Sequence, residues 1–346
     1  MIGRGVLLLG AFLLVGAMPA TAQSSTPPAT PRSATDNVAI WTIQNENDST
    51  GVGQRRFTDA YYSNGLRIGW TSAPGTVPET LKGLATTLWG AGETRMSIDL
   101  THKMYTGLDT RLRNPPLGDR PYAGVAMANL GLVQDGTTQT GLDTRSTMVL
   151  GIGLVGPAAG AQGLQNGFHK FIDQPGARGW TTQLRNEPLL QLTSERTWRL
   201  PIATIGPIET DALPSLTAAV GNLRAYLQTG ITIRLGQGLR SDFGAARLRP
   251  AVTGGDTFRP TIPFAWYVFV GADGRAVARD LTLEGNTFVS SRSVKKVPIV
   301  GAMHGGLAIM AYGMRLTYTH TLTSQEFRRQ RGGLHQVGSL ALSVRF

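Results

Sequence analysis

The ten residues VGSLALSVRF, from Val337 to Phe346, carry the pattern that decides the fold. Leu340, Leu342 and Val344 alternate with small or polar residues, and the stretch stops on an aromatic side chain. Because successive side chains of a β strand point to opposite faces, this alternation predicts a strand with one apolar and one polar face. Such a strand fits an outer-membrane barrel better than a soluble periplasmic β-sandwich, which is the alternative fold.

The same period of two recurs along most of the chain. Leu66, Ile68 and Trp70, for example, alternate with polar or small neighbours. Strand-like stretches cover residues 38–44, 66–71, 122–133, 147–154, 188–198, 213–219, 231–235, 264–272, 297–311, 315–319 and 337–346. In a membrane barrel the apolar faces meet lipid, the other faces line the lumen, and closure removes the unpaired edges. We therefore predict an all-β fold for residues 38–346, an antiparallel transmembrane β-barrel of about 12 strands.

The composition narrows the class of protein further. The chain has 346 residues, 44 glycines, no cysteine and a formal charge of +11 at pH 7. A chain without cysteine has no disulfide scaffold, thiolate metal site or cysteine nucleophile. The many glycines disfavour long helices. The basic surplus admits nucleic acid, an anionic membrane surface or an acidic lipid as the partner.

The N-terminal residues decide the compartment. Arg4 is the only charge among residues 1–22, an apolar run follows it, and the small residues of an Ala-Thr-Ala run end at Ala22. This pattern predicts a secretory signal peptide over these residues; a membrane anchor is the alternative, but anchors need about 20 apolar residues. Residues 23–37, rich in Ser, Thr, Pro and Ala, follow as a flexible lead-in. We expect an exported protein of the Gram-negative outer membrane, which argues against nucleic acid as the partner.

One segment, residues 156–180, interrupts the alternation. Apolar residues recur within it at helical spacing, namely Leu164, Phe168, Phe171 and Ile172. This spacing predicts a short amphipathic helix, placed in an extracellular segment or at the barrel mouth. Gln165, His169 and Asp173 follow one another at intervals of four along a neighbouring polar stripe. We therefore expect His169 and Asp173 to lie within reach of each other.

Three familiar motifs are absent or out of context. Residues 151–156 fit the dinucleotide pattern GxGxxG, but the strand before them has one apolar face and no second parallel strand follows. The nucleophile elbow GxSxG is missing, which argues against an ordinary α/β-hydrolase esterase. None of the five histidines belongs to an HExxH motif, so a zincin is unsupported as well.

An oxygen-rich cluster lies near the start of the predicted barrel. Asn47 and Asp48 follow the first predicted strand, and Asp59 and Ser63 stand where the second one opens. Carboxylate, amide and hydroxyl oxygens from two strand ends are ligands that a hard cation such as Ca²⁺ takes. Asn, Asp and Gly are also ordinary turn residues that join two strands, so the spacing alone leaves both interpretations open.

Several short motifs along the chain resemble those of one known protein family. They are Asn47-Asp48, Tyr62-Ser63-Asn64-Gly65, GDRPYAG at 118–124, QNGFHK at 165–170, GW at 179–180, QLRNEP at 183–188, DFG at 242–244, GNTF at 285–288 and EF at 326–327. Together they resemble the family of outer-membrane lipid A 3′-O-deacylases. The motifs run in order from the first predicted strand to the last, so the resemblance covers nearly all of the predicted barrel.

The resemblance implies an activity and a site. A barrel of this family removes an ester-linked acyl chain from lipid A in the outer leaflet, with Ca²⁺ as the cofactor. Carried over by motif, His169 is the general base. Asn47, Asp48 and Ser63 belong to the catalytic group, and the first two also bind the metal. Ser63 stands where the family commonly has Thr, so the hydroxyl is kept. Asp173 is the nearest match to a further acidic residue after the histidine, which makes it a third predicted metal ligand.

These implied roles agree with the chemistry of the side chains. Histidine titrates near neutral pH, so His169 can take a proton from water that attacks the ester carbonyl. Ca²⁺ held by Asp48 would act as a Lewis acid toward the developing oxyanion. A non-enzymatic barrel, such as a small porin or a structural outer-membrane protein, is the alternative function that the sequence leaves open.

The basic surplus suits a phosphorylated lipid. Lipid A carries phosphates, and Arg or Lys at a barrel mouth holds phosphates in charge-assisted pairs. The candidates in segments near the predicted site are Arg55, Arg56, Lys103, Lys170 and Arg178. Each of them is as readily an ordinary solvated side chain. We predict lipid A and the outer membrane as partners, no nucleic acid, and a monomer as the oligomeric state.

Overall fold

The computed structural model describes residues 38–48, 59–245 and 257–346, so the predicted signal peptide and lead-in lie outside the described residues. The strands are β1 (Ile40–Asn47), β2 (Tyr61–Thr71), β3 (Gly92–Thr106), β4 (Ala123–Thr137), β5 (Asp143–Val155), β6 (Glu187–Trp198), β7 (Leu200–Ile205), β8 (Ile208–Gly221), β9 (Arg224–Gln237), β10 (Phe264–Asp280), β11 (Ile299–Ala311), β12 (Met314–Thr323) and β13 (His335–Arg345). The helices are α1 (Glu79–Trp89), α2 (Ala161–Phe171) and α3 (Leu281–Glu284), with 3₁₀ turns η3 (Pro74–Thr76), η4 (Pro157–Ala159), η5 (Gly179–Thr182) and η6 (Leu239–Ser241).

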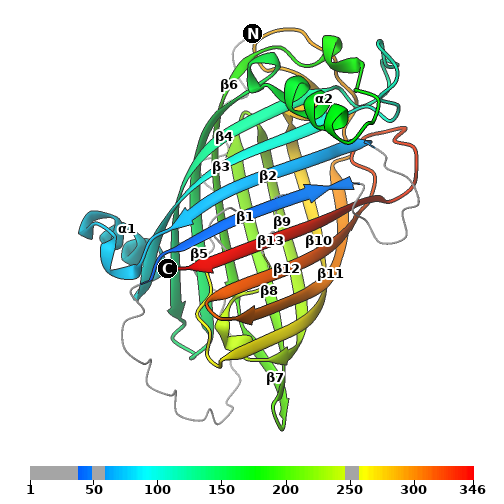
Figure 1. Cartoon of the computed structure of the whole chain (residues 1–346). Coiled ribbons are helices and arrows are strands. Elements are labelled where there is room, and N and C mark those ends of the chain that lie inside the picture. The colour runs from blue at the N-terminus through cyan, green and yellow to red at the C-terminus, as the bar shows by residue number, and fades with distance from the viewer. Residues whose placement is uncertain (1–37, 49–58, 246–256) are drawn as a thin grey trace. The chain divides into compact units, whose positions relative to one another are not determined.

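The strands close into a barrel (Figure 1). Neighbours pair antiparallel from β1 to β6 and from β8 to β13, and β1 pairs with β13. The remaining seam is closed by β6 and β8, whose pairing runs from Gln191 opposite Gly221 to Thr197 opposite Ser215. Within the described residues β7 pairs with β8 alone and extends that hairpin beyond the rim. Twelve of the described strands thus form a closed barrel and one is extra, which confirms the predicted fold and rules out a β-sandwich.

The barrel strands have the polarity that a membrane requires. On β1, Trp41 and Ile43 are 49% and 57% exposed on the outer face, whereas Thr42, Gln44 and Glu46 are buried inside. Exposed apolar side chains recur at alternate positions on the other strands of the barrel. Lipid takes the place of water around such a surface, so its apolar side chains carry no exposure cost. The lumen is lined by the polar side chains that the sequence alternation predicts.

Four described elements were missing from the sequence prediction, namely the strands β3 and β7 and the helices α1 and α3. β3 alternates like its neighbours, since Ile98 and Leu100 are exposed and Ser97 and Asp99 are buried. α1 begins directly after Pro78 and connects β2 to β3. Among the described residues, no helix is both long and apolar enough to cross a membrane. The glycines of the GxGxxG match lie on and just after the antiparallel strand β5, so their context is not that of a dinucleotide fold.

The barrel has two differently built ends (Figure 1). The end that carries α2 is named the α2 end, and the end at which β1 begins and β13 finishes is named the terminal end. α1 and β7 extend from the terminal end. The long connection between β5 and β6, which contains α2 and η5, covers the α2 end.

A cluster of charged side chains occupies the lumen toward the terminal end. Its centre is Asp242, which directly follows η6. The Asp242 carboxylate accepts hydrogen bonds from Arg234 at 2.6 Å, from Arg315 at 2.9 Å and from the Tyr267 hydroxyl at 2.8 Å. Two further arginine guanidinium groups lie 4.4 and 4.8 Å from the centroid of the adjacent Phe243 ring. These five residues form the lumen cluster, in which side chains of β9, β10 and β12 bind the connection between β9 and β10.

Candidate active site

The ends of β1 and β2 form a corner at the α2 end. Asn47 of β1 lies opposite Asn64, the residue that follows Ser63. Ser63 is the extra residue of a β-bulge, because the pairing of β2 with β3 passes from Tyr62 directly to Asn64. The bulge buries the Ser63 hydroxyl, which shares a 2.6 Å hydrogen bond with the Thr106 hydroxyl of β3. Bulges of this kind commonly re-aim side chains beside active sites.

Asp48 closes this corner against the chain that enters β2. Its buried carboxylate accepts a hydrogen bond from the Ala60 backbone N–H at 2.5 Å. The Ala60 carbonyl oxygen lies 2.9 Å from Nε2 of His335, and the next residue, Tyr61, has a left-handed φ of 65°. The chain is therefore held at two backbone atoms and turns sharply at this point. This arrangement places Asp59 one residue away from the contact with Asp48.

Helix α2 turns its polar side toward the barrel. Gln165 is buried, whereas the apolar residues Leu164, Phe168 and Phe171 are exposed, the last of them at 85%. This orientation reverses that of a helix on a soluble protein, whose apolar stripe faces the core. The predicted amphipathic helix is confirmed, although it begins only after Gly160, because that residue takes the left-handed conformation after η4.

His169 lies on the polar side of α2 and pairs with Asp59. Its Nε2 atom is 2.7 Å from Asp59 Oδ2, and its Nδ1 atom is 2.7 Å from the Pro175 carbonyl oxygen. Because a carbonyl oxygen only accepts, Nδ1 carries a proton, and one further proton lies between Nε2 and the carboxylate. Burial raises the pKa of Asp59, and the charge of His169 offsets part of that rise. The pair therefore holds a proton that an imidazole and a carboxylate share.

Gln165 supports this pair from one turn earlier on α2. Its side-chain nitrogen donates to Asp59 Oδ2 at 2.9 Å, and its side-chain oxygen accepts from the Trp180 indole N–H at 2.7 Å. Trp180 is buried and packs edge-on against Tyr122. Side chains from α2, η5 and the segment before β2 thus hold the imidazole and the carboxylate in one arrangement.

Asp173 does not join this cluster. α2 ends at Phe171, and Asp173 is exposed, with a left-handed φ of 55°. The expected contact between His169 and Asp173 is absent, because the chain reverses after α2 and presents the Pro175 carbonyl to the imidazole instead. Within the described part of the chain the Asp173 carboxylate makes no hydrogen bond or ion pair. Its role as a metal ligand stays a prediction.

The sequence interpretation gave Asp59 no catalytic role and Gln165 no role at all, although both lay in stretches that it singled out. Asp59 belongs to the oxygen-rich cluster, and Gln165 begins the polar stripe of the helix. Their hydrogen bond joins positions that are 106 residues apart in the sequence. The sequence pattern around each residue was therefore recognisable, but no pattern predicted that the two residues are in contact.

The corner offers oxygen ligands of the type that Ca²⁺ takes. Asn47, Asp48 and Ser63 bring an amide, a carboxylate and a hydroxyl to the ends of two paired strands. Among the described residues, no three His, Cys, Asp or Glu side chains are grouped to hold a metal ion. A cation at this corner would thus depend on neutral oxygens around the Asp48 carboxylate, which suits a hard cation and does not suit Zn²⁺.

Only some of the predicted phosphate-binding arginines and lysines lie within the described residues. Arg55 and Arg56 lie outside the described residues. Lys170 and Arg178 are exposed in the connection that covers the α2 end, and Lys103 lies on β3 opposite Gly65 of β2. The described members of the set therefore lie on the side of the barrel that carries the His169 site.

Fold and site together define a class of protein. A closed antiparallel barrel with apolar side chains outside is the fold of an outer-membrane protein. One mouth of this barrel carries a histidine–carboxylate pair and the bulged start of a strand. The chain belongs to the family described as outer membrane protein LpxR, whose family model matches residues 7–346. The resemblance found in the motifs is confirmed by this match.

The fold is also similar to those of solved outer-membrane proteins. LpxR from Salmonella typhimurium matches with a TM-score of 0.73 and 19% sequence identity, over 89% of this chain and 100% of that chain. The β domain of the Bordetella autotransporter Brka matches with a TM-score of 0.46 and 10% identity, over 90% and 100% of the two chains. The NanC porin matches with a TM-score of 0.37 and 6% identity, over 88% and 100%. No curated protein sequence gives a significant match.

Proposed function

We propose that this protein is an outer-membrane esterase that removes an ester-linked acyl chain, at the 3′-acyloxyacyl position, from lipid A. The observation that carries the proposal is the His169–Asp59 pair on the polar side of α2, at a mouth of the barrel. Membership of the LpxR family supports it, because the motifs of this chain resemble those of the lipid A 3′-O-deacylases.

The exposed stripe of α2 supports a lipid substrate. Leu164, Phe168 and Phe171 point away from the barrel, and His169 lies on the adjoining polar side. A helix with this division lies at a membrane interface, with its apolar side toward the acyl chains. The ester bond of an acylated sugar also lies between acyl chains and headgroup. A helix in that position would bring the imidazole close to such a bond, which supports the proposal.

His169 is the group that takes the proton of the attacking water. The Pro175 carbonyl holds the proton on Nδ1, so Nε2 is the nitrogen that accepts. Nε2 faces Asp59, so before the reaction the proton that the two groups share must pass to solvent and a water molecule must take its place beside Nε2. As the bond between the acyl carbon and the sugar oxygen breaks, the proton passes from Nε2 to that oxygen. Asp59, held by Gln165, remains near enough to stabilise the imidazolium that forms in between.

The corner of β1 and β2 supplies the second part of the site. Asn47, Asp48 and Ser63 would hold Ca²⁺, which supplies a positive charge toward the oxyanion of the ester. Ser63 is fixed for this purpose by its bulge and by its hydrogen bond to Thr106. The Asp48 carboxylate is buried at the strand end, so its negative charge favours a cation there.

The lumen cluster argues against a porin as the alternative function. Asp242, Arg234 and Arg315 are fully buried in the lumen and bind one another directly. A water-filled channel needs an open lumen, whereas these side chains are closed off from solvent. A structural barrel without activity is distinguished from the esterase by the experiment that follows.

The proposal is tested by the mass of lipid A. Wild-type protein is expressed in a strain that makes lipid A, and the extracted lipid is weighed by mass spectrometry with and without a chelator. We expect loss of one acyl chain with the wild type, and its retention with the chelator. His169→Ala should lower the rate by about 10²–10⁴, the usual contribution of a general base. Asp48→Ala should abolish the response to added Ca²⁺.

A matched control uses a histidine elsewhere on the same barrel. His320→Ala changes a side chain of β12 that has no contact with the site, so its acyl loss should equal that of the wild type. Folding of all variants is checked by their heat-modifiable mobility on gels. Equal acyl release by the wild type and by folded His169→Ala protein would contradict the mechanism. Intact lipid A with every variant, wild type included, would favour a barrel without enzymatic activity.

A further inference from the structure

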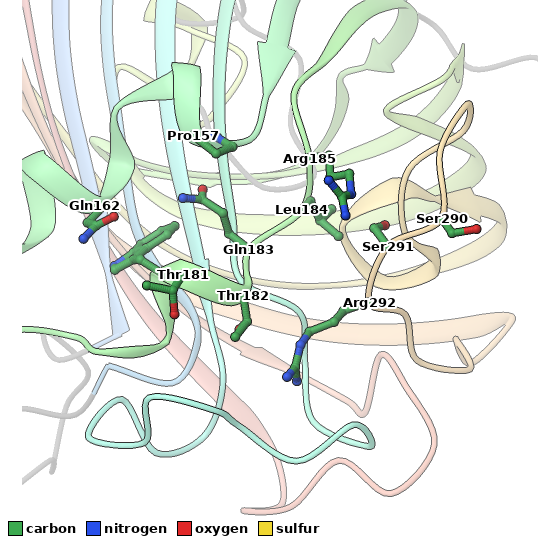
Figure 2. Close-up of a pocket in the computed structure, with 11 residues that line it drawn as sticks. Pro157, Gln162, Thr181, Thr182, Gln183, Leu184, Arg185, Ser290, Ser291 and Arg292 are labelled. Carbon is green, nitrogen blue, oxygen red and sulfur yellow. The ribbon is translucent and has the colours of Figure 1, made fainter.

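A separate cavity opens at the α2 end (Figure 2). Its volume is about 460 Å³, a size typical of small-molecule sites. One wall consists of residues 180–185, which lead from η5 into β6, and the other consists of residues 290–292 in the loop after α3. Pro157 and Gln162 complete the lining. We name this space the Arg185 cavity.

Two arginines give the Arg185 cavity its charge. Arg185 is exposed to it, and within the described residues its guanidinium makes no hydrogen bond or ion pair. Arg292 donates to the Pro115 carbonyl at 2.7 Å and to the Asn114 side-chain oxygen. Both of these acceptors are neutral, and no ion pair compensates the charge of Arg292 within the part of the chain that the structure describes. Among the described residues, no Asp or Glu lines the cavity. Two positive charges in a concave space attract an anion.

The walls of the cavity are held in place before any ligand binds. The Asn286 side chain accepts from the Arg185 N–H at 2.9 Å and donates to the Arg185 carbonyl at 2.8 Å. The Asn286 N–H in turn donates to the Ser291 hydroxyl at 2.9 Å, which joins the two walls. Figure 2 shows Arg185 and Ser291 projecting toward the same space. A site that is ordered in advance loses less free energy when it binds.

The donors in the cavity match one chemical group. The Thr181 and Ser290 hydroxyls line it together with the two guanidinium groups. Guanidinium forks and hydroxyls are the donors that proteins use for phosphate, since each phosphate oxygen accepts several hydrogen bonds. A volume near 460 Å³ also leaves room for a sugar ring beside a phosphate.

The cavity is linked directly to the candidate active site. Trp180 lines it, and the Trp180 indole donates to Gln165. Gln165 donates to Asp59, the partner of His169. A group bound in the cavity is therefore separated from the imidazole by a short chain of contacts. Such a spacing suits two parts of one substrate molecule.

We propose that the Arg185 cavity binds a phosphate on the sugar backbone of the lipid substrate, and that it makes the enzyme selective for phosphorylated glycolipid. The inference rests on the proposed function for the reaction that follows binding. Arg185 and Arg292 act here as substrate-binding residues, while the chemistry stays with the His169–Asp59 pair. Removal of one guanidinium lowers the affinity for phosphorylated lipid and leaves lipid without phosphate unaffected.

The test compares two substrates and three variants. Deacylation by Arg185→Gln is measured in mixed micelles with lipid A and with lipid A from which the phosphates have been removed. We expect kcat/KM for phosphorylated lipid to fall by about 10–100-fold, as for loss of a charge-assisted hydrogen bond, and no change with dephosphorylated lipid. Arg185→Lys, which keeps the charge without the fork, should recover part of the loss. Equal losses on both substrates, or none, would overturn the proposal.

Arg328→Gln is the matched control. Arg328 is exposed in the loop between β12 and β13 and does not line the cavity, so its removal changes the charge of the α2 end by the same amount. It should leave the ratio of the two kcat/KM values at the wild-type level. A comparable fall of that ratio with Arg328→Gln would assign the effect to general charge and overturn a specific site.

A binding measurement separates this proposal from the esterase activity. Binding of phosphorylated and dephosphorylated lipid A is measured in micelles in the His169→Ala background, with inorganic phosphate as a competitor. Weaker binding of phosphorylated lipid by the Arg185→Gln double variant supports the cavity even if the wild type releases no acyl chain. Inorganic phosphate that binds at Arg185 while lipid phosphorylation has no effect would mean an adventitious anion site and overturn the proposal.

Discussion

The two ends of the barrel use similar side chains in opposite ways. In the lumen cluster, the Asp242 carboxylate is fully buried and is bound by two arginines and a tyrosine. At the α2 end, the side chains of Asp59 and His169 are each 14% exposed, and they share one proton. Both places hold a carboxylate beside a basic group, so residue type alone does not separate a structural cluster from a reactive one.

The difference lies in burial and in the supply of donors. Asp242 contacts arginines, which stay charged, so no proton is transferred between the arginines and the carboxylate in this cluster. Asp59 meets an imidazole, which can act as a donor or as an acceptor, and both groups reach solvent. Under the proposed function, the carboxylate with surplus charged donors stabilises the barrel, whereas the one that faces an imidazole near the surface serves catalysis.

The largest expected effect comes from Asp242→Ala. This change leaves Arg315 and one side of Arg234 buried without the carboxylate that they bind. Breaking such a pair costs about 3–5 kcal/mol of unfolding free energy, because the remaining charge stays desolvated. The measurement is urea unfolding of the barrel in lipid vesicles, followed by gel mobility. Activity per folded molecule should stay near the wild-type value.

Asp143→Ala provides the control at the same end. Its partner Arg240 is largely exposed, and the two side chains are 3.1 Å apart. Exposed pairs contribute about 0–1 kcal/mol, so the unfolding midpoint should hardly move. If both variants unfolded at the same urea concentration, the lumen cluster would not be the stabilising feature inferred here.

Asp59→Asn should have the opposite effect to Asp242→Ala, because it should lower the activity and leave the stability nearly unchanged. The amide preserves the shape of the side chain but no longer carries the charge that stabilises an imidazolium. We expect kcat to fall by about 10–100-fold, a fraction of the general-base contribution, with KM and the unfolding midpoint nearly unchanged. Deacylation rates across the pH range are the decisive measurement, because a merely structural role would leave the pH profile of kcat in place.

Asp109→Asn is the control for this change. Asp109 is a carboxylate of the same end that pairs with the exposed Arg111, away from the imidazole. Its rate and pH profile should match those of the wild type. A fall in barrel stability with Asp59→Asn, without any change in kcat, would place Asp59 with the lumen cluster as a structural residue.

The fold was predictable because the outer face of each barrel strand contacts lipid. The alternation of apolar and polar residues therefore appears within the sequence of each strand alone. Leu340 and Leu342 of β13 are exposed at alternate positions, and the sequence shows that alternation without knowledge of any partner strand. α2 was predictable for the same reason, from Leu164 and Phe168 one turn apart. β7 shows the limit of this signal. All its residues are exposed, so no face is selected and no alternation results.

The site was only half predictable from the sequence. Asn47, Asp48 and Ser63 come together through the pairing of two consecutive strands, which the pattern predicts. The pairing of His169 with Asp59 depends instead on how α2 folds over the mouth after the barrel closes. Nothing in the local sequence of either residue encodes that contact. Asp173 missed its expected position because it lies beyond the end of α2 and itself takes a left-handed φ of 55°.

The smallest expected effect is the pH dependence of stability that Asp59 causes. It again distinguishes Asp59 at the α2 end from Asp242 at the terminal end. Burial raises the pKa of Asp59 above its ordinary value of 3.8, so the folded protein favours the protonated carboxyl. The contribution of this group to stability is therefore fully present below pH 3.8 and is lost as the pH rises through the folded-state pKa. The wild type should lose stability relative to Asp59→Asn over that interval, and the difference should be constant at higher pH. Urea unfolding of both proteins from pH 3 upward measures it. A difference that grew in favour of the wild type with rising pH would mean that the His169 charge outweighs burial, and that Asp59 is an ion-pair residue like Asp242.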